Sequence, residues 1–124
     1  MPAELFPRRD LAGAAAGCRS IIAAPAGGWT HVPLGEWELR SGAGFGDCHP
    51  YEEINIVLQG RLVVDCDGVR VEAGPGDVVR VPPDRPAYYS AAPYARMFYV
   101  YGTNPEGLAS TTFADRAAAA PADG

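Results

Sequence analysis

Short runs of alternating apolar and polar residues, each ended by a turn sequence, follow one another through the second half of this chain. Asp67-Gly68 separates Arg61–Cys66 from Val69–Ala73, and Asp-Gly is a favoured hairpin turn because both central positions take a positive φ. Gly74-Pro75-Gly76 forms the next turn, before a strand predicted over Asp77–Val81. Regularly spaced short strands with turns between them predict an antiparallel sandwich or a closed barrel.

Four further alternating runs extend this pattern on both sides: Trp29–Val32, Trp37–Arg40, Tyr88–Ser90 and Ala95–Tyr101. The 124 residues include 15 glycines and 12 prolines, which favour many turns and short strands over long helices. A chain of this length provides the core of one domain. We therefore expect an all-β, single-domain barrel over residues 29–102, with a short N-terminal arm at 1–28 and a C-terminal extension at 103–124 that is mobile at its end.

Charge and hydropathy argue against several classes of partner. The formal net charge is −5 and lysine is absent, which disfavours binding to nucleic acid or to an anionic membrane. No stretch approaches the roughly 18–20 apolar residues of a membrane span. Leu11–Gly17 follows Arg8-Arg9 as in a signal peptide but is only weakly apolar, so we interpret it as a helical or loose arm. We expect a cytoplasmic protein whose three cysteines, which form no CxxC pair, remain reduced.

The stretch from residue 47 to residue 60 carries the most chemical information. If it is extended, one face bears Asp47, His49, Tyr51, Glu53 and Asn55, and the other bears Ile54, Ile56 and Leu58. In an ordinary half-buried strand the polar face would contact water, whereas in a barrel with a functional interior it would line the cavity. The glycine-rich segment just before it lacks the Gly-Lys-Ser/Thr ending and the helix of a phosphate loop, so we do not expect a nucleotide site there.

Two motifs resemble those of the cupin superfamily, the RmlC-like jelly-roll barrels. Glu53-x6-Gly60 resembles the end of the first cupin motif, and the stretch from Gly68 through Gly74-Pro75-Gly76-Asp77 to Pro82-Pro83 resembles the second. Both motifs occur in the expected order and separation, within roughly residues 45–101. The resemblance implies a double-stranded β-helix, or jelly roll, whose interior holds a small molecule.

In metal-binding cupins the first motif supplies two histidines and a glutamate, and the second supplies a further histidine. Glu53 matches the family's glutamate and His49 its second histidine, whereas Asp47 stands in place of the first histidine and Ala87 in place of the last. Two other segments, 51–54 and 93–101, are similar to the EutQ-type cupins of ethanolamine utilisation, in which the metal-binding set is likewise depleted. That branch has been linked to acetate kinase activity.

The residues of the first motif allow two kinds of chemistry. Asp47, His49 and Glu53 offer one nitrogen and two carboxylates, which suits one divalent ion such as Mn, Fe, Ni or Zn. Without a metal, His49 titrates near neutrality and the pKa of Glu53 should rise inside an apolar barrel, so the two can act as base and acid. We expect either no required cofactor or one divalent metal, with His49, Glu53 and Tyr51 as catalytic residues.

Asn55, Arg80, Tyr88 and Tyr99 are the candidates for binding a small-molecule substrate. Tyr88 or Tyr99 can donate a hydrogen bond to a carbonyl, and Arg80 can bind a carboxylate or a phosphate if it points inward; solvent exposure is the alternative for Arg80. The aliphatic face of residues 54, 56 and 58 needs cover, which predicts a homodimer.

Two classes of function follow from these residues. The first is a small enzyme of the isomerase, cyclase or lyase type, acting by acid–base chemistry with or without a metal on an organic acid or a carbonyl compound. The second is a non-catalytic cupin that binds a ligand or takes part in an assembly. An acetate kinase of the EutQ type is a further alternative, although no phosphate loop is present.

Overall fold

The structure is a computed structural model that describes residues 3, 5, 12–15, 18–22 and 33–114. These residues form antiparallel strands, as the alternating sequence predicts, and no helix among them is long and apolar enough to cross a membrane. The strands are β1 (Ala12–Ala15), β2 (Cys18–Ile22), β3 (Leu34–Arg40), β4 (Gly44–Cys48), β5 (Glu53–Cys66), β6 (Val69–Ala73), β7 (Val78–Val81), β8 (Ala87–Tyr101) and β9 (Thr111–Phe113).

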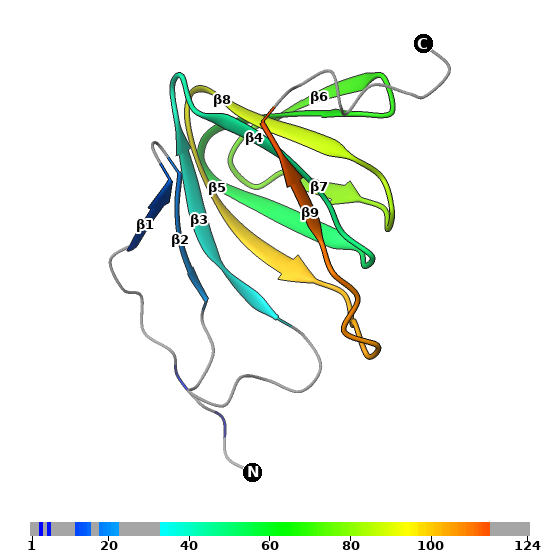
Figure 1. Ribbon diagram of the computed structural model, residues 1–124. Helices are drawn as coiled ribbons and strands as arrows, with labels where there is room; N and C mark the ends of the chain where they lie inside the picture. Colours follow the sequence, from blue (N-terminus) through cyan, green and yellow to red (C-terminus); the bar gives the residue numbers. More distant parts are fainter. Residues whose placement is uncertain (1–2, 4, 6–11, 16–17, 23–32, 115–124) are drawn as a thin grey trace.

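Strands β5 and β8 are long, pair with each other throughout, and belong to both halves of the fold. One sheet runs β1-β2-β3-β8-β5-β7 and the other runs β9-β4-β8-β5-β6, with β5 and β8 bending from the first into the second (Figure 1). The register of β5 shifts on both sides of Gly60, which has a φ of +74°, and the bend of β8 contains the exposed pair Ala92-Pro93. The expected all-β jelly roll is therefore confirmed.

The structure differs from the predicted strands in β8 and in the N-terminal region. Tyr88–Ser90 and Ala95–Tyr101 belong to one bent strand instead of two, because pairing with β5 continues on both sides of the bend. In the N-terminal region, where we expected a helical or loose arm, β1 pairs with β2, and β2 extends the sheet beyond β3. The strand predicted at Trp29–Val32 and the mobile end predicted for the C-terminal extension lie outside the described residues.

The turn between β5 and β6 has the predicted conformation. Asp67 and Gly68 have φ values of 53° and 75°, both in the left-handed region. A two-residue hairpin turn of this kind matches the right-handed twist of the flanking strands. This turn places Leu62 opposite Ala73 and Val64 opposite Val71.

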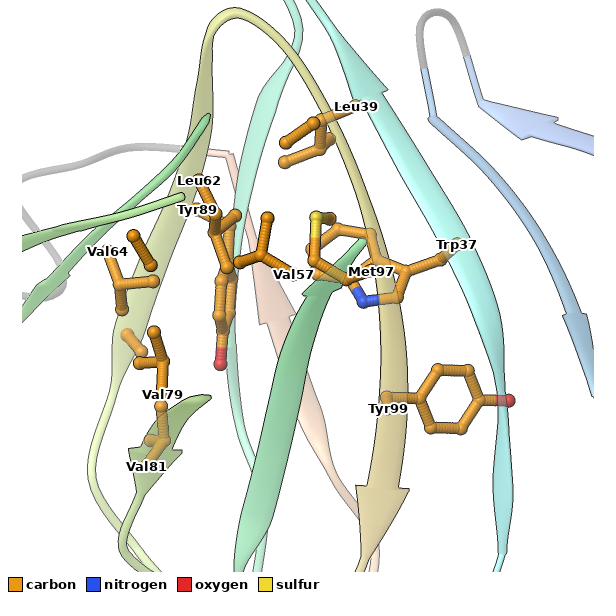
Figure 2. Packing of buried hydrophobic residues seen from close by; sticks show 13 residues of the cluster. Trp37, Leu39, Val57, Leu62, Val64, Val79, Val81, Tyr89, Met97 and Tyr99 are labelled. Atoms are coloured by element: carbon orange, nitrogen blue, oxygen red, sulfur yellow. The ribbon is translucent and has the colours of Figure 1, made fainter. Parts of the chain in front are cut away.

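An apolar cluster fills the space between the two sheets. Its largest members include Trp37, Leu39, Leu62, Tyr89 and Met97, and the Trp37 indole meets the Tyr89 ring edge to face, with 5.6 Å between centroids (Figure 2). The Tyr89 hydroxyl points away from Leu39 and Leu62 (Figure 2). Three acidic or amide side chains are also buried on the inner face, namely Asp47, Glu53 and Asn55. The interior thus combines an apolar core with polar groups that need partners.

We predict that Gly60→Ala destabilises the protein far more than Gly76→Ala. Both glycines have a positive φ, +74° at Gly60 and +89° at Gly76. A methyl group at Gly60 would also overlap the backbone carbonyl of Tyr94, whereas at Gly76 it would meet no atom within 4 Å. Urea unfolding should show a loss of about 3–5 kcal/mol for Gly60→Ala and about 1–2 kcal/mol for Gly76→Ala. Equal losses would contradict the close approach of β5 and β8 at Gly60.

Candidate functional site

The polar side chains of the predicted first motif meet where β4 ends and β5 begins. Asp47 lies near the end of β4, Glu53 begins β5, and His49 stands in the connection between them. This connection is held by backbone hydrogen bonds on both sides: the Asp84 N–H donates to the His49 carbonyl at 2.8 Å, and the Gly102 N–H donates to the Glu52 carbonyl at 2.7 Å. Residues 49–52 do not form a strand, yet the His49 side chain lies beside Asp47 and Glu53.

Asp47, His49 and Glu53 form a compact cluster. The His49 Nε2 atom lies 3.0 Å from Asp47 Oδ2 and 4.0 Å from Glu53 Oε2. One ligand atom from each of the three residues lies within 4.8 Å of the other two. The predicted metal-ligating set is thus brought together by the fold.

Three buried polar atoms of this region have no hydrogen-bond partner: Asp47 Oδ1, His49 Nε2 and Asn55 Nδ2. His49 Nε2 is close to Asp47 Oδ2 but makes no hydrogen bond with it, since such a bond needs alignment as well as proximity. Unpartnered buried polar groups are costly, so their concentration at one place marks a site for another group. One imidazole nitrogen with two carboxylates fits a divalent first-row metal ion.

Burial and the neighbouring Asp47 carboxylate raise the pKa of Glu53 to about 7. The Tyr89 hydroxyl donates a hydrogen bond to Glu53 Oε2 inside the barrel. For His49, burial lowers the pKa, but the interactions with Asp47 and then Glu53 outweigh it and raise the pKa overall. Without a metal, the cluster therefore holds exchangeable protons near neutral pH, as expected from the sequence.

Aromatic rings surround the imidazole of His49. Tyr51 stacks on it with 4.8 Å between centroids and an interplanar angle of 14°, and Tyr101 lies 5.0 Å from it. Tyr99 stacks in turn on Tyr101 at 4.6 Å. Burial raises the pKa of Tyr51, Tyr99 and Tyr101, so these phenols stay protonated at neutral pH and can donate hydrogen bonds.

Two of the four predicted substrate-binding residues lie in the interior. Asn55 is fully buried and its Oδ1 atom accepts a hydrogen bond of 2.7 Å from the indole N–H of Trp37. Tyr99 is buried on the same side of the sheet, opposite Asn55 in the register of β5 and β8. Both side chains therefore lie on the inner face of the barrel, as the prediction requires.

The other two predicted substrate-binding residues face outward, which corrects their placement. Arg80 is exposed and pairs with Glu52 on the outside of the barrel, because its neighbours Val79 and Val81 take the inward positions of β7. Tyr88 lies on the opposite face of β8 from buried Tyr89, with its hydroxyl over Gly44. Neither side chain reaches the cluster at His49.

Ala87, which stands in place of the last histidine of the motif, lies opposite Asp47. The two residues are register partners between β4 and β8, and Ala87 is fully buried. A methyl group cannot ligate a metal, so β8 contributes no ligand at this point. The candidate metal site consists of first-motif residues alone.

Sequence reasoning missed three residues of the site: Tyr89, Tyr101 and Ser110. Tyr89 and Tyr101 occupy odd-numbered positions of β8, as do the inward-facing residues Ala87 and Tyr99. Because alternate side chains of a strand point to the same face, strict alternation along β8 would have found them. Ser110 lies beyond the predicted barrel, yet its Oγ atom is 2.6 Å from His49 Nδ1. Nothing in the local sequence around Ser110 signals this contact.

Comparisons with known proteins agree with the geometry. The cupin domain family model matches residues 35–101. EutQ from Clostridium difficile shares the fold with 24% sequence identity and a TM-score of 0.64, over 69% of this chain and 68% of that one. KdgF from Halomonas sp. is 18% identical, with a TM-score of 0.72, over 83% of this chain and 96% of that one. Salicylate 1,2-dioxygenase from Pseudoaminobacter salicylatoxidans is 21% identical, with a TM-score of 0.68, over 73% of this chain and 26% of that one. No curated protein matches the chain significantly.

The likeness to these structures concerns the fold, since each is less than 25% identical to the chain. The family match covers more than half of the chain and includes His49, Glu53 and the hairpin between β5 and β6. The inward-facing cluster also stands at the motif positions from which the resemblance was drawn. The chain therefore belongs to the cupin family.

Proposed function

We propose that this cupin is a small-molecule enzyme that binds one divalent metal ion through Asp47, His49 and Glu53 and catalyses a proton-transfer reaction of the isomerase, cyclase or lyase type. The observation that carries the proposal is the close approach of these three residues, with ligand atoms within 4.8 Å of one another. Two of those residues also present buried atoms without hydrogen-bond partners, Asp47 Oδ1 and His49 Nε2. A bound ion supplies Lewis-acid polarisation of a substrate oxygen.

Each side chain around the ion has a role that its position supports. Asp47 and Glu53 provide negative charge, and Tyr89 orients the Glu53 carboxyl through its hydroxyl. The Tyr51 hydroxyl, beside the imidazole, is a donor for a substrate carbonyl or alkoxide. Asn55, held by Trp37, has an amide N–H₂ that is free to hydrogen bond a ligand. The aromatic rings exclude water from the reacting atoms.

The charge of the interior favours a metal-assisted reaction for any anionic substrate. Asp47 and Glu53 face inward, whereas Arg80 pairs with Glu52 at the surface, and Arg96 pairs with Glu36 on the outer face of the sheet. In the described part of the chain no arginine lines the cluster, so an organic acid would meet carboxyl groups without a compensating guanidinium. A divalent cation between the carboxylates would remove this repulsion. We therefore propose a carbonyl compound or organic acid as substrate, bound to the ion through oxygen.

A non-catalytic role is the second candidate, and Ala87 favours it. Because Ala87 faces Asp47 where metal-binding relatives place a histidine, the ligand set is smaller than in those cupins. A cupin that only binds a ligand or joins an assembly would tolerate this loss. The two candidates differ in what removal of His49 or Glu53 should do, because binding can survive a change that abolishes turnover.

We predict that purified protein prepared without chelator contains close to one equivalent of Mn, Fe, Ni or Zn, and that His49→Gln and Glu53→Gln remove it. The loss of one of three ligands should lower metal affinity by at least 100-fold. Elemental analysis and the thermal shift on adding each ion measure this. Glu72→Gln, at an exposed position on β6, is the matched control and should retain metal. Wild-type protein with well under one equivalent and no thermal shift would contradict the proposal.

The catalytic part of the proposal is tested on the same variants. With a candidate carbonyl substrate found by screening, turnover should fall by at least 100-fold in His49→Gln and Glu53→Gln. Circular dichroism should show that both variants remain folded. Substrate binding without turnover in the wild-type protein would favour the non-catalytic alternative.

We predict that metal-free protein loses stability as pH rises from about 5 to 8. The pKa of Glu53 is about 7 in the folded protein against an ordinary value of 4.5. The stability that this carboxyl group contributes is therefore full below about pH 4.5 and is lost as pH rises through about 7. The raised pKa of His49 acts in the same direction. Urea unfolding in EDTA measures the free energy of unfolding at each pH. Between about pH 5 and 8 it should decrease by on the order of 3 kcal/mol more in the wild type than in Glu53→Gln. Equal decreases in the two proteins would refute the buried neutral Glu53.

We also propose that the chain forms a homodimer through the outer face of β5 and β7. Ile56 pairs there with Val78 and Phe98 across the strands, and Val78 is 61% exposed. A second copy would cover this apolar row. Sedimentation at micromolar concentration should give a dimer for the wild type and a monomer for Val78→Asp. Val69 is equally exposed, at 61%, but lies on β6, so Val69→Asp should leave the dimer intact. A wild-type protein that sediments as a monomer would exclude the proposed dimer.

A further inference from the structure

The segment between β8 and β9 has a defined structure of its own. Asn104-Pro105-Glu106-Gly107 forms a turn in which the Gly107 N–H donates to the Asn104 carbonyl at 3.1 Å. Proline at the second position and glycine at the fourth suit a β-turn. The Asn104 side chain also bonds Leu108 twice, accepting from its N–H at 3.0 Å and donating to its carbonyl at 2.8 Å. The turn directs the chain back toward the barrel.

Strand β9 then attaches this segment to β4. Thr111 is the register partner of Cys48, which places Ser110 beside the end of β4. The Phe113 ring lies directly on Gly46, so close that a methyl group at Gly46 would overlap it. The glycine thus allows Phe113 to pack against β4. Pairing on one side and the Asn104 turn on the other fix the position of Ser110.

Ser110 makes two contacts within the candidate site. Its Oγ atom lies 2.6 Å from His49 Nδ1, and its hydroxyl donates to Tyr51 Oη at 3.3 Å. A serine hydroxyl has one hydrogen to donate. If that hydrogen goes to Tyr51, the Oγ atom accepts from His49, and Nδ1 must carry a proton. The neutral imidazole then has its lone pair on Nε2, the atom that faces Asp47 and Glu53.

We infer that Ser110 is a positioning residue that holds neutral His49 in the Nδ1–H tautomer and so directs the Nε2 lone pair into the cluster of Asp47 and Glu53. The opposite tautomer would remove the proton that Nδ1 donates to Ser110 and would place an N–H at Nε2, where Asp47 Oδ2 at 3.0 Å is the nearest acceptor. Partners of this kind on the second ring nitrogen fix ring orientation in metal sites. The consequence for metal affinity rests on the proposed function, whereas the tautomer itself does not.

Consequently, the C-terminal segment is part of the site even though it lies outside the predicted barrel. The turn at Asn104 positions the segment that carries Ser110, and Ser110 contacts His49. From the other side, Phe113 packs on Gly46 and so holds β9, which follows the same serine. Displacing β9 should therefore alter the imidazole without any change to a residue that touches it.

The tautomer can be read by ¹H–¹⁵N NMR of the histidine side chains in metal-free protein, at a pH where His49 is neutral. Ser110→Val and Ser110→Thr have nearly the same shape, but only threonine keeps the hydroxyl. We expect the Nδ1–H form in the wild type and in Ser110→Thr, and a shift toward the Nε2–H form in Ser110→Val. Gly46→Ala should give the same shift as Ser110→Val by moving Phe113 and β9. An unchanged tautomer in folded Ser110→Val would overturn the inference.

Metal titration separates this inference from the proposed function. Using Ni²⁺ and Mn²⁺ as probes, we expect Ser110→Val to bind 10–100-fold more weakly than the wild type, and Ser110→Thr to restore affinity to within about threefold. Affinities equal in all three proteins would overturn the role of Ser110 while leaving the metal site intact. If the wild type bound neither ion, the proposed function would fail, and the NMR comparison would still decide the tautomer.

Discussion

Two carboxyl groups inside one small barrel set the conditions that the rest of the structure must meet. Asp47 and Glu53 are 6% and 3% exposed, and both lie beside the imidazole of His49. Burying a charge without a partner is costly, and two like charges at close range add to that cost. The Tyr89 hydroxyl, the imidazole and a proton on Glu53 are the means by which the metal-free protein satisfies this pair.

The long strands β5 and β8 make this arrangement possible. Glu53 at the start of β5 is the register partner of Tyr101 at the end of β8, while Cys66 at the other end of β5 pairs with Ala87. The bend at Gly60 brings both ends of the pair around the same interior. As a result, Tyr89 from one sheet can reach Glu53 from the other. The apolar cluster between the sheets supports the polar site, and Tyr89 and Tyr99 belong to both.

Most of the fold and part of the site could be predicted from the sequence, because both depend on local rules. Alternation with period two gave the strands and placed Asp47, Glu53 and Asn55 on a common face, and Asp67-Gly68 set the register of the hairpin. The motif resemblance identified Ala87 as the position of the missing histidine, and the structure places that position opposite Asp47. These features need only strand geometry and turn chemistry.

What could not be predicted depends on contacts between distant segments. Arg80 stands in the run Val-Val-Arg-Val, whose hydrophobicity does not show which of its valines point inward. The contact between Ser110 and His49 spans two pairings, β8 with β4 and β4 with β9. No periodic pattern in the three residues of β9 predicts where that strand attaches.

The charge of the cluster links its two proposed states. Without a metal, the raised pKa values of Glu53 and His49 favour protons on both groups; with both carboxylates ionised, His49 neutral and one divalent ion present, the charges sum to zero. The interior of low polarity favours such neutral combinations over charged ones. Metal binding therefore releases protons from the cluster, since ligands must be deprotonated. The tautomer set by Ser110 determines which imidazole nitrogen gives up its proton, and Nε2 is the one that faces both carboxylates.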